Sequence, residues 1–200
     1  MESKQPPSNP QDFLTSAAVL LLKSSVSITE RCFEDTEKVF PSDADQSPMV
    51  REVLAFLSSI VLHEARAKDP TESAVDINQT CHQLKDALVP VTNLDSEYLR
   101  HSLCFDDQAF HELMANYFNG KIEGFQLQKE ELEGTSELIG IPIPSTRGLE
   151  SIFFALITRL LRLTQIDSIS EETEQKKAAV HFTQLTETGV SSFGLALQLL

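Results

Sequence analysis

The residues best suited to coordination chemistry lie close together near the middle of the chain: His101, Cys104 and His111. Imidazole and thiolate groups are the ligands that zinc prefers. On one continuous helix, positions 101, 104, 108 and 111 would share a face, because steps of three and four residues return to the same side. Phe105-Asp106, however, has the pattern of a new helix start, which would break that helix and turn the two histidines apart. We therefore expect no metal site. The candidate ligands, if the helix were continuous, are His101, Cys104 and His111.

Other spacings that would support catalysis are missing. Glu97 and His101 are one residue too far apart for the Glu-x-x-His pair of carboxylate di-metal bundles. His63-Glu64 is followed by Ala67, where a zincin would have its second histidine. The seven glycines form neither a P-loop nor G-x-G-x-x-G, and no G-x-S-x-G occurs. The sequence predicts no catalytic residue and no cofactor.

The stretch from Gly148 to Asp167 has the widest apolar face of any helix pattern in the chain. Its apolar side chains cover an arc of roughly 200°, and its polar strip is narrow: Ser151, Thr158, Arg162 and Gln165. A surface helix needs about half that apolar width, so we expect other helices to cover this one on two sides.

Residues 157–161 of that stretch, Ile-Thr-Arg-Leu-Leu, are similar to the short LxxLL-type helical peptides that dock in grooves. Their place in the most buried-looking helix favours core packing instead.

Caps and apolar periodicity predict further helices along the chain. These begin at Asn9, Ser47, Asp69, Leu94, Phe105 and Ser168, and the first and last end near Val39 and Gly189. In the helix from Ser47, five polar residues fall away from the middle of the apolar stripe: Arg51, Glu52, Ser58, Ser59 and Arg66.

The apolar residues of 121–137 fit neither a helical nor a strand period well. Ile139 to Pro144 is the one segment expected to be extended. Its two prolines cannot donate hydrogen bonds to a neighbouring strand, so we expect either a buried crossover or an edge strand. The predicted fold is an all-α bundle or orthogonal array of about six to eight helices. Residues 1–8 form a disordered tail and residues 9–200 one helical domain, with a subdivision near 121–147 as an alternative.

The net charge is −14, from 30 acidic and 16 basic residues, which disfavours nucleic acids and anionic membranes as partners. No membrane span is expected, because the longest apolar run near the N-terminus, residues 17–22, is far too short. Three scattered cysteines indicate a reducing compartment. We therefore expect a cytoplasmic protein, or a nuclear one if the source is eukaryotic.

With no catalytic pattern, the sequence favours a non-enzymatic interaction module, namely an adaptor, regulatory or assembly subunit. Apolar residues continue to Leu200. The apolar face of the 148–167 helix is also wide enough to exceed what the other helices of one chain can cover. We therefore expect a protein partner or a second copy to cover the remaining apolar surface. The alternative is a helical small-molecule or lipid-binding domain with an apolar cavity, which could be an enzyme. The residues proposed for the interface or cavity, expected equally in a dry core, are Phe153, Phe154, Ile157, Leu161, Phe182 and Phe193.

Overall fold

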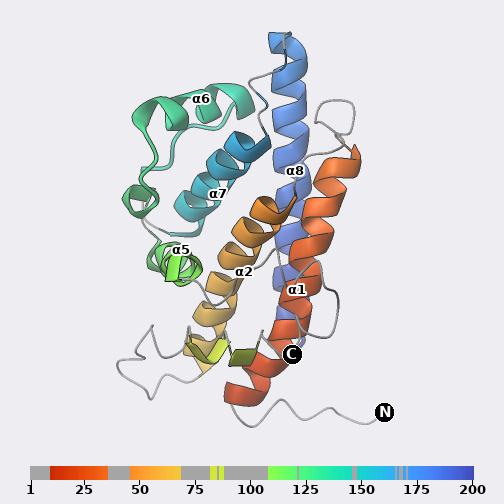
Figure 1. Ribbon diagram of the computed structural model, residues 1–200, viewed down its shortest axis with the longest axis vertical. Helices are drawn as coiled ribbons and strands as arrows, with labels where there is room; N and C mark the ends of the chain where they lie inside the picture. Colours follow the sequence, from red (N-terminus) through yellow and green to blue (C-terminus); the bar gives the residue numbers. More distant parts are fainter. Residues whose placement is uncertain are drawn as a thin grey trace.

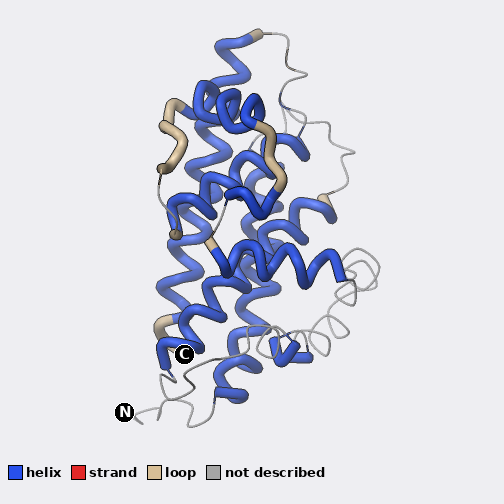
Figure 2. Tube along the Cα trace, turned by 90° about the vertical axis from the view of Figure 1, so that its left-hand side faces the viewer, coloured by secondary structure: helices blue, strands red, loops and turns tan. Residues whose placement is uncertain are grey.

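The computed structural model describes residues 10–35, 46–68, 82–84, 86–87, 108–120, 122–145, 148–164, 166, 169 and 171–200. Its complete elements are α1 (Pro10–Asp35), α2 (Ser47–Lys68), α5 (Gln108–Asn119), the 3-10 helix η1 (Ile122–Phe125), α6 (Lys129–Ile139), α7 (Leu149–Thr164) and α8 (Glu172–Leu197). No strand occurs within the described ranges (Figure 2). The predicted all-α fold is confirmed.

The helices form an elongated bundle in which α1 and α8 lie side by side and run in opposite directions (Figure 1). Helix α2 contacts four other helices, α1, α5, α7 and α8. Helix α6 packs on α7 and α8, and η1 lies between α5 and α7. The element with neighbours on most sides is therefore α2, whereas the sequence indicated the 148–167 helix as the centre.

Helix α2 is buried over most of its circumference, including positions that its sequence pattern set apart from the apolar stripe. Glu52, Ser58 and Ser59 are all buried. The two serine hydroxyls donate to backbone carbonyls of their own helix, Ser58 to Leu54 at 2.7 Å and Ser59 to Phe56 at 2.6 Å. Because these hydroxyls are satisfied locally, α2 can enter the core without leaving polar groups unpaired.

Helix α7 confirms the expectation of cover on two sides, because it packs on α2 and on α6. The LxxLL-like residues Ile157, Leu160 and Leu161 are buried in the core. The predicted polar strip is only partly correct, since Ser151 and Thr158 are buried too. The Thr158 hydroxyl, like the α2 serines, donates to a carbonyl of its own helix.

Residues 121–137, expected to be irregular, contain η1 and most of the three-turn helix α6. The backbone N–H of Gln128 donates to Glu131 Oε2 at 2.8 Å and fixes the start of α6. Gly140 ends α6 in the left-handed conformation, φ 71°, with its N–H on the Ser136 carbonyl. This turn directs residues 141–145 outward, where Ile141 is 45% exposed. The predicted buried crossover or strand at 139–144 is therefore wrong.

Helix α8 continues well past the predicted end at Gly189 and reaches Leu197. It begins after Glu171, and the capping box predicted at Ser168 includes residues outside the described ranges. The apolar C-terminal residues divide by helical periodicity. Phe193 and Leu197 enter the core, while Leu195 is 67% exposed.

The predicted tail at 1–8 and the predicted helix from Leu94 also lie outside the described ranges. Residues 82–84 and 86–87 are helical and fall inside the helix predicted from Asp69.

One described segment, Phe13–Glu34 on α1, is long and apolar enough to cross a membrane, with a mean hydropathy of 1.2. Half of its most apolar window is buried inside the bundle, and core helices of soluble proteins meet the same criterion. The segment does not by itself indicate a membrane span.

Helices α1 and α8 approach closely at Gly189, and this contact yields a stability prediction. A Cβ at position 189 would lie 2.4 Å from Ile28 Cγ1, so Gly189→Ala should lower the free energy of unfolding by about 1–3 kcal/mol through overpacking. Chemical denaturation measures the change. Gly194→Ala in the same helix is the matched control, because a Cβ there meets nothing within 4 Å; it should stabilise by about 0.5–1 kcal/mol. Equal effects of the two substitutions would contradict the close contact.

Candidate functional site

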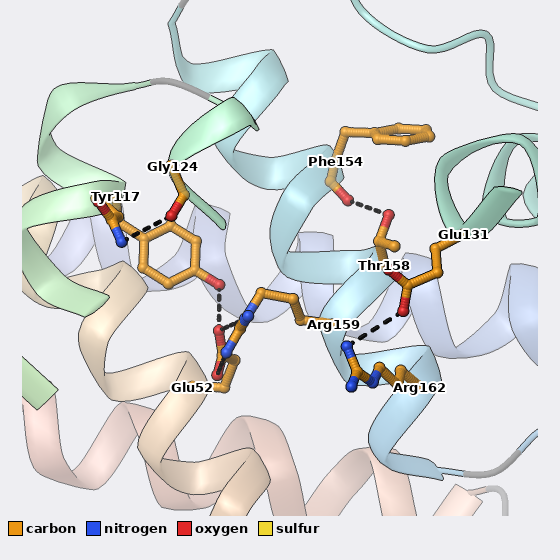
Figure 3. A network of polar contacts seen from close by, with 9 residues as sticks. Glu52, Tyr117, Gly124, Glu131, Phe154, Thr158, Arg159 and Arg162 are labelled. Carbon is orange, nitrogen blue, oxygen red and sulfur yellow. Dashed lines mark hydrogen bonds and ion pairs between the residues drawn. The ribbon is translucent and has the colours of Figure 1, made fainter. Parts of the chain in front are cut away.

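A buried carboxylate, that of Glu52 on α2, joins three helices. Its side chain is 5% exposed. Oε1 accepts a hydrogen bond from the Tyr117 hydroxyl of α5 at 2.7 Å. Arg159 of α7 donates to both oxygens, from Nε to Oε1 and from Nη2 to Oε2 at 3.1 Å (Figure 3). We call Glu52, Tyr117 and Arg159 the polar triad.

Tyr117 is positioned by the apolar face of α5. Phe110, Met114 and Tyr117 follow one another at helical spacing, and all three are buried. The rings of Phe56 from α2 and Tyr117 pack edge to face, with ring centroids 5.4 Å apart. These contacts fix the phenol ring, so that its hydroxyl points at Glu52.

The 3-10 helix η1 supplies an aromatic wall beside the polar triad. Phe125 is buried, its ring centroid lies 4.5 Å from that of Tyr117, and the Arg159 guanidinium carbon lies 5.8 Å from it on the face of the ring. Asn116 Nδ2 of α5 donates to the Gly124 carbonyl at 3.0 Å and ties η1 to α5. The guanidinium thus lies between a carboxylate and an aromatic face, which are both favourable partners for it.

Tyr117 and Arg159 keep their protons at neutral pH. Burial, and then the neighbouring Glu52 charge, raise the pKa of the Tyr117 phenol well above its usual value of 10.0. Burial disfavours the charge on Arg159, but the hydrogen bond and the charge of Glu52 outweigh this and raise its pKa. Tyr117 therefore stays a hydrogen-bond donor and Arg159 a cation.

A cavity of about 520 Å³ is formed by residues of α2, α5, η1 and α7, next to the polar triad. Among the described residues, three of the seven arginines in the chain, and no lysine, line it. Its walls combine apolar and charged side chains. The lining residues are Pro48, Arg51, Glu52, Ala109, Glu112, Leu113, Asn116, Gly124, Phe125, Gln126, Arg159, Arg162 and Leu163.

The three arginines of the cavity have different surroundings. Arg159 belongs to the polar triad, and the guanidinium carbon of Arg51 lies 5.8 Å from the Phe110 ring centroid. Arg162 Nη1 forms an ion pair with Glu131 Oε1 of α6 at 3.2 Å, with the Arg162 side chain 66% exposed (Figure 3). The cavity therefore has a half-buried cation, held by Glu52, on one side and an exposed one at its rim.

The candidate metal ligands receive no support from the described part of the chain. His101 and Cys104 lie outside it. His111 is on α5, where its ring meets the His82 ring edge to face at 4.7 Å. Among the described residues, no group of three His, Cys, Asp or Glu side chains could hold a metal ion.

The residues predicted for an apolar interface or cavity lie mainly in the core. Phe154, Ile157, Leu161, Phe182 and Phe193 are buried, and Phe153 packs partly buried against them. Phe193 also lines a smaller cavity of about 260 Å³ between α1 and α8. The others line neither this cavity nor the larger one. Their burial agrees with the core packing that the sequence allowed equally.

Sequence reasoning missed the polar triad altogether. Its members are 65 and 107 residues apart along the chain, so no local spacing connects them. One signal was present: Arg159 falls within the most apolar helix, and a cation in such a helix requires a carboxylate partner. The identity of the carboxylate that pairs with Arg159 depends on the tertiary fold.

No protein-family model matches the sequence, and comparison with curated proteins and with solved structures gives no significant match. The candidate site is therefore interpreted from its own geometry.

Breaking the ion pair of the buried Glu52 carboxylate should destabilise the fold far more than breaking the exposed pair of Arg162 and Glu131. Arg159→Met removes the cation and leaves the Glu52 carboxylate buried, which should lower the free energy of unfolding by about 3 kcal/mol or more. Arg162→Met, in the same helix, removes only the exposed pair with Glu131 and should cost less than about 1 kcal/mol. Urea denaturation distinguishes the two. Similar losses for both variants would contradict the structural role of the polar triad.

The raised pKa of Tyr117 predicts a specific dependence of stability on pH. The folded protein retains the phenol proton at a higher pH than the unfolded chain, so its stabilising contribution is complete below pH 10.0 and is lost as the pH rises further. Tyr117→Phe should remove this part of the alkaline decline and cost about 1–2 kcal/mol at neutral pH. Unfolding curves of both proteins between neutral pH and pH 11 provide the measurement. Identical alkaline slopes would show that the phenol does not contribute.

Proposed function

We propose that this protein is a non-enzymatic, α-helical interaction module that binds a partner protein at the cavity formed by α2, α5, η1 and α7. The observation that carries the proposal is the combination of residue types around this cavity. Arginine and aromatic side chains, which are enriched where proteins bind one another, gather there in a chain with few basic residues.

The apolar part of the rim supports binding of a protein segment. Leu163 is 41% exposed and Leu113 is partly buried, and both line the cavity together with Phe125. Exposed apolar side chains beside a depression provide area that a partner can bury.

The base of the cavity is held by interactions that cross three helices. Glu52 accepts from Tyr117 and Arg159, while Asn116 holds η1 in place. A surface that is already ordered loses little conformational entropy when a partner binds, so more of the contact energy appears as affinity.

The electrostatics also favour binding over proton-transfer chemistry. With its pKa raised well above 10.0, the Tyr117 phenol retains its proton near neutral pH, and Arg159, with its raised pKa, retains its charge. A general acid or base works best when its pKa lies near the operating pH, and these two groups do not meet that condition.

A small polar molecule is the second candidate ligand. The volume of about 520 Å³ falls in the range of small-molecule pockets. The three arginines and the amide of Asn116 make the lining suited to a polar or charged compound, whereas a lipid would require an apolar wall.

Site-specific cross-linking tests whether a partner docks at this cavity. A photoreactive residue in place of Leu163 should cross-link one discrete partner protein. The matched control is the same residue in place of Leu195, which is also an exposed leucine but lies on α8, away from the cavity lining. The captured partner, once purified, should bind Leu163→Asp about tenfold or more weakly and Leu195→Asp with unchanged affinity.

Two results would contradict the proposal. Equal cross-linking from both positions would indicate adventitious contact, and unchanged affinity of Leu163→Asp would place the partner elsewhere. Native mass spectrometry of the purified protein decides on the second candidate, because a small ligand adds mass that disappears on denaturation.

A further inference from the structure

We infer that the smaller cavity, between α1 and α8, binds the phosphate group of a small soluble phosphate ester, with the organic part of the ester on its apolar floor. Lys23 and Arg31 hold the phosphate from two sides. This site is independent of the proposed function, because no residue lines both this cavity and the larger one.

The smaller cavity lies where α1 and α8 pack side by side, and its volume is about 260 Å³ (Figure 1). Two basic side chains from α1, Lys23 and Arg31, line it. Among the described residues, its lining contains no carboxylate. The lining therefore carries two positive charges, although the chain as a whole has 30 acidic and 16 basic residues.

Neither of these positive charges is neutralised within the described part of the chain. Lys23 and Arg31 are exposed, and no ion pair there includes either of them. Five other described basic residues do pair with glutamates: Lys129, Arg159, Arg162, Lys176 and Lys177. The smaller cavity thus has a surplus of positive charge that those pairs lack.

The acidic residues next to Arg31 do not remove this surplus. Glu30 and Glu34 are also on α1, but both are exposed and neither lines the smaller cavity. Within the described residues, neither carboxylate forms an ion pair with Arg31. An anion that enters the cavity therefore meets the two cations without competing with a protein carboxylate for them.

Serine hydroxyls of α1 add donors to the same lining. Ser24 and Ser27 line the smaller cavity, and no described hydrogen bond uses either hydroxyl. Ser25 and Thr29, which are buried on the same helix, instead donate to carbonyls one turn back at 2.8 and 3.0 Å. The two hydroxyls in the lining are thus available to a ligand.

The spacing of the polar residues brings their donors together. Ser27 is four residues from both Lys23 and Arg31, so the three share one face of α1 and the serine lies between the two cations. Each step of four residues rises only about 6 Å, which the long lysine and arginine side chains can span. A single group beside Ser27 is therefore within reach of both cations.

The number of charges and donors favours a phosphate over a carboxylate. A phosphate monoester carries about −1.5 to −2 charges at neutral pH, which matches the two cations. It also presents three free oxygens, which can accept from the guanidinium fork, the ammonium group and a hydroxyl together. A carboxylate has one charge and two oxygens, so it would leave part of the lining unused.

The floor of the smaller cavity indicates that the phosphate carries an organic group. Ile28 and Phe193 are 5% and 2% exposed, and both line the cavity together with Leu185. Inorganic phosphate would make no use of them, whereas an ester can bury an apolar group there. The volume lies just below the roughly 300–1,000 Å³ of typical small-molecule pockets, so the ester is small.

The net charge of −14 favours a soluble ester over the head group of a membrane lipid. At physiological ionic strength charges are screened over about 8 Å, so a small ester in the cavity is affected mainly by Lys23 and Arg31. An anionic membrane surface would instead face much of the acidic protein and be repelled by it.

Titration of the full chain with phenyl phosphate, monitored by NMR, tests the inference. This probe joins a phosphate to a small apolar ring. It should shift the Arg31 side-chain Nε–Hε signal and the Gly189 amide signal in a saturable way, with an affinity of about 1 mM or better. Absence of saturable shifts overturns the inference.

Two simpler anions test the two halves of the ligand. Inorganic phosphate should shift the Arg31 signal but bind at least about fivefold more weakly than phenyl phosphate, because it leaves the floor uncovered. Equal affinities would overturn the role of the floor. Benzoate should also bind more weakly than phenyl phosphate, and tighter binding of benzoate would overturn the choice of phosphate.

Charge variants locate the site. Lys23→Gln combined with Arg31→Gln should weaken binding of phenyl phosphate about tenfold or more. Arg66→Gln combined with Lys129→Gln is the matched control, because it also removes two exposed positive charges, and neither residue lines the smaller cavity. An equal loss in the control would show nonspecific charge attraction and overturn the inference.

A serine variant tests the placement of the phosphate between the two cations. Ser27→Ala should weaken binding about three- to tenfold through the loss of one hydrogen bond. Ser191→Ala is its control, since Ser191 is an exposed serine of α8 outside the lining, and it should leave the affinity unchanged. Unchanged affinity of Ser27→Ala would overturn this placement.

Vesicles distinguish a soluble ester from a lipid head group. The full chain should not sediment with phosphatidylcholine vesicles that contain phosphatidic acid. Sedimentation that the Lys23 and Arg31 substitutions abolish would overturn the soluble source and assign the phosphate to a lipid. The same substitutions should leave cross-linking through Leu163 unchanged, so the phosphate site and the proposed function can fail separately.

Discussion

The carboxylate of Glu52 in the core is the constraint on which the arrangement of α2, α5 and α7 depends. A buried charge without partners would cost several kcal/mol, so the fold is acceptable only when Arg159 and Tyr117 both reach it. Hydrophobic contacts bring the three helices together without specifying their exact rotation and register. The directional bonds to one carboxylate do specify them, and the wall formed by Phe125 follows from the same alignment.

Local sequence patterns predicted the features that depend on local physics. The start of α2 at Ser47 and the burial of α7 follow from caps and apolar periodicity. The same reasoning failed where tertiary contacts decide. Gly189 was predicted to end α8, but the helix continues through it. The glycine is favoured there by the close contact with Ile28, which leaves no room for a Cβ. Residues 129–139 are helical although their apolar spacing is poor, because α6 packs on both α7 and α8.

The candidate site could not be predicted for a related reason. The polar triad and the cavity combine side chains from α2, α5, η1 and α7, and a single sequence contains no record of which helices become neighbours. The candidate metal ligands His101, Cys104 and His111 were suggested by their closeness in sequence alone. Glu52 and Arg159 are ordinary surface residue types whose significance comes from burial, which only the packed structure reveals.

The bonds that tie η1 to its neighbours also determine which parts of the molecule open together. Asn116 holds the Gly124 carbonyl, and Phe125 covers Arg159 and Tyr117. Lifting η1 would admit water to the Glu52–Arg159 ion pair, so we expect η1, α5 and the Glu52 turn of α2 to open as one unit, with their amides exchanging hydrogen together. Residues 141–143 and 145 are exposed, with no such tie among the described contacts, and we expect the amides of Ile141, Ile143 and Ser145 to exchange independently of that unit.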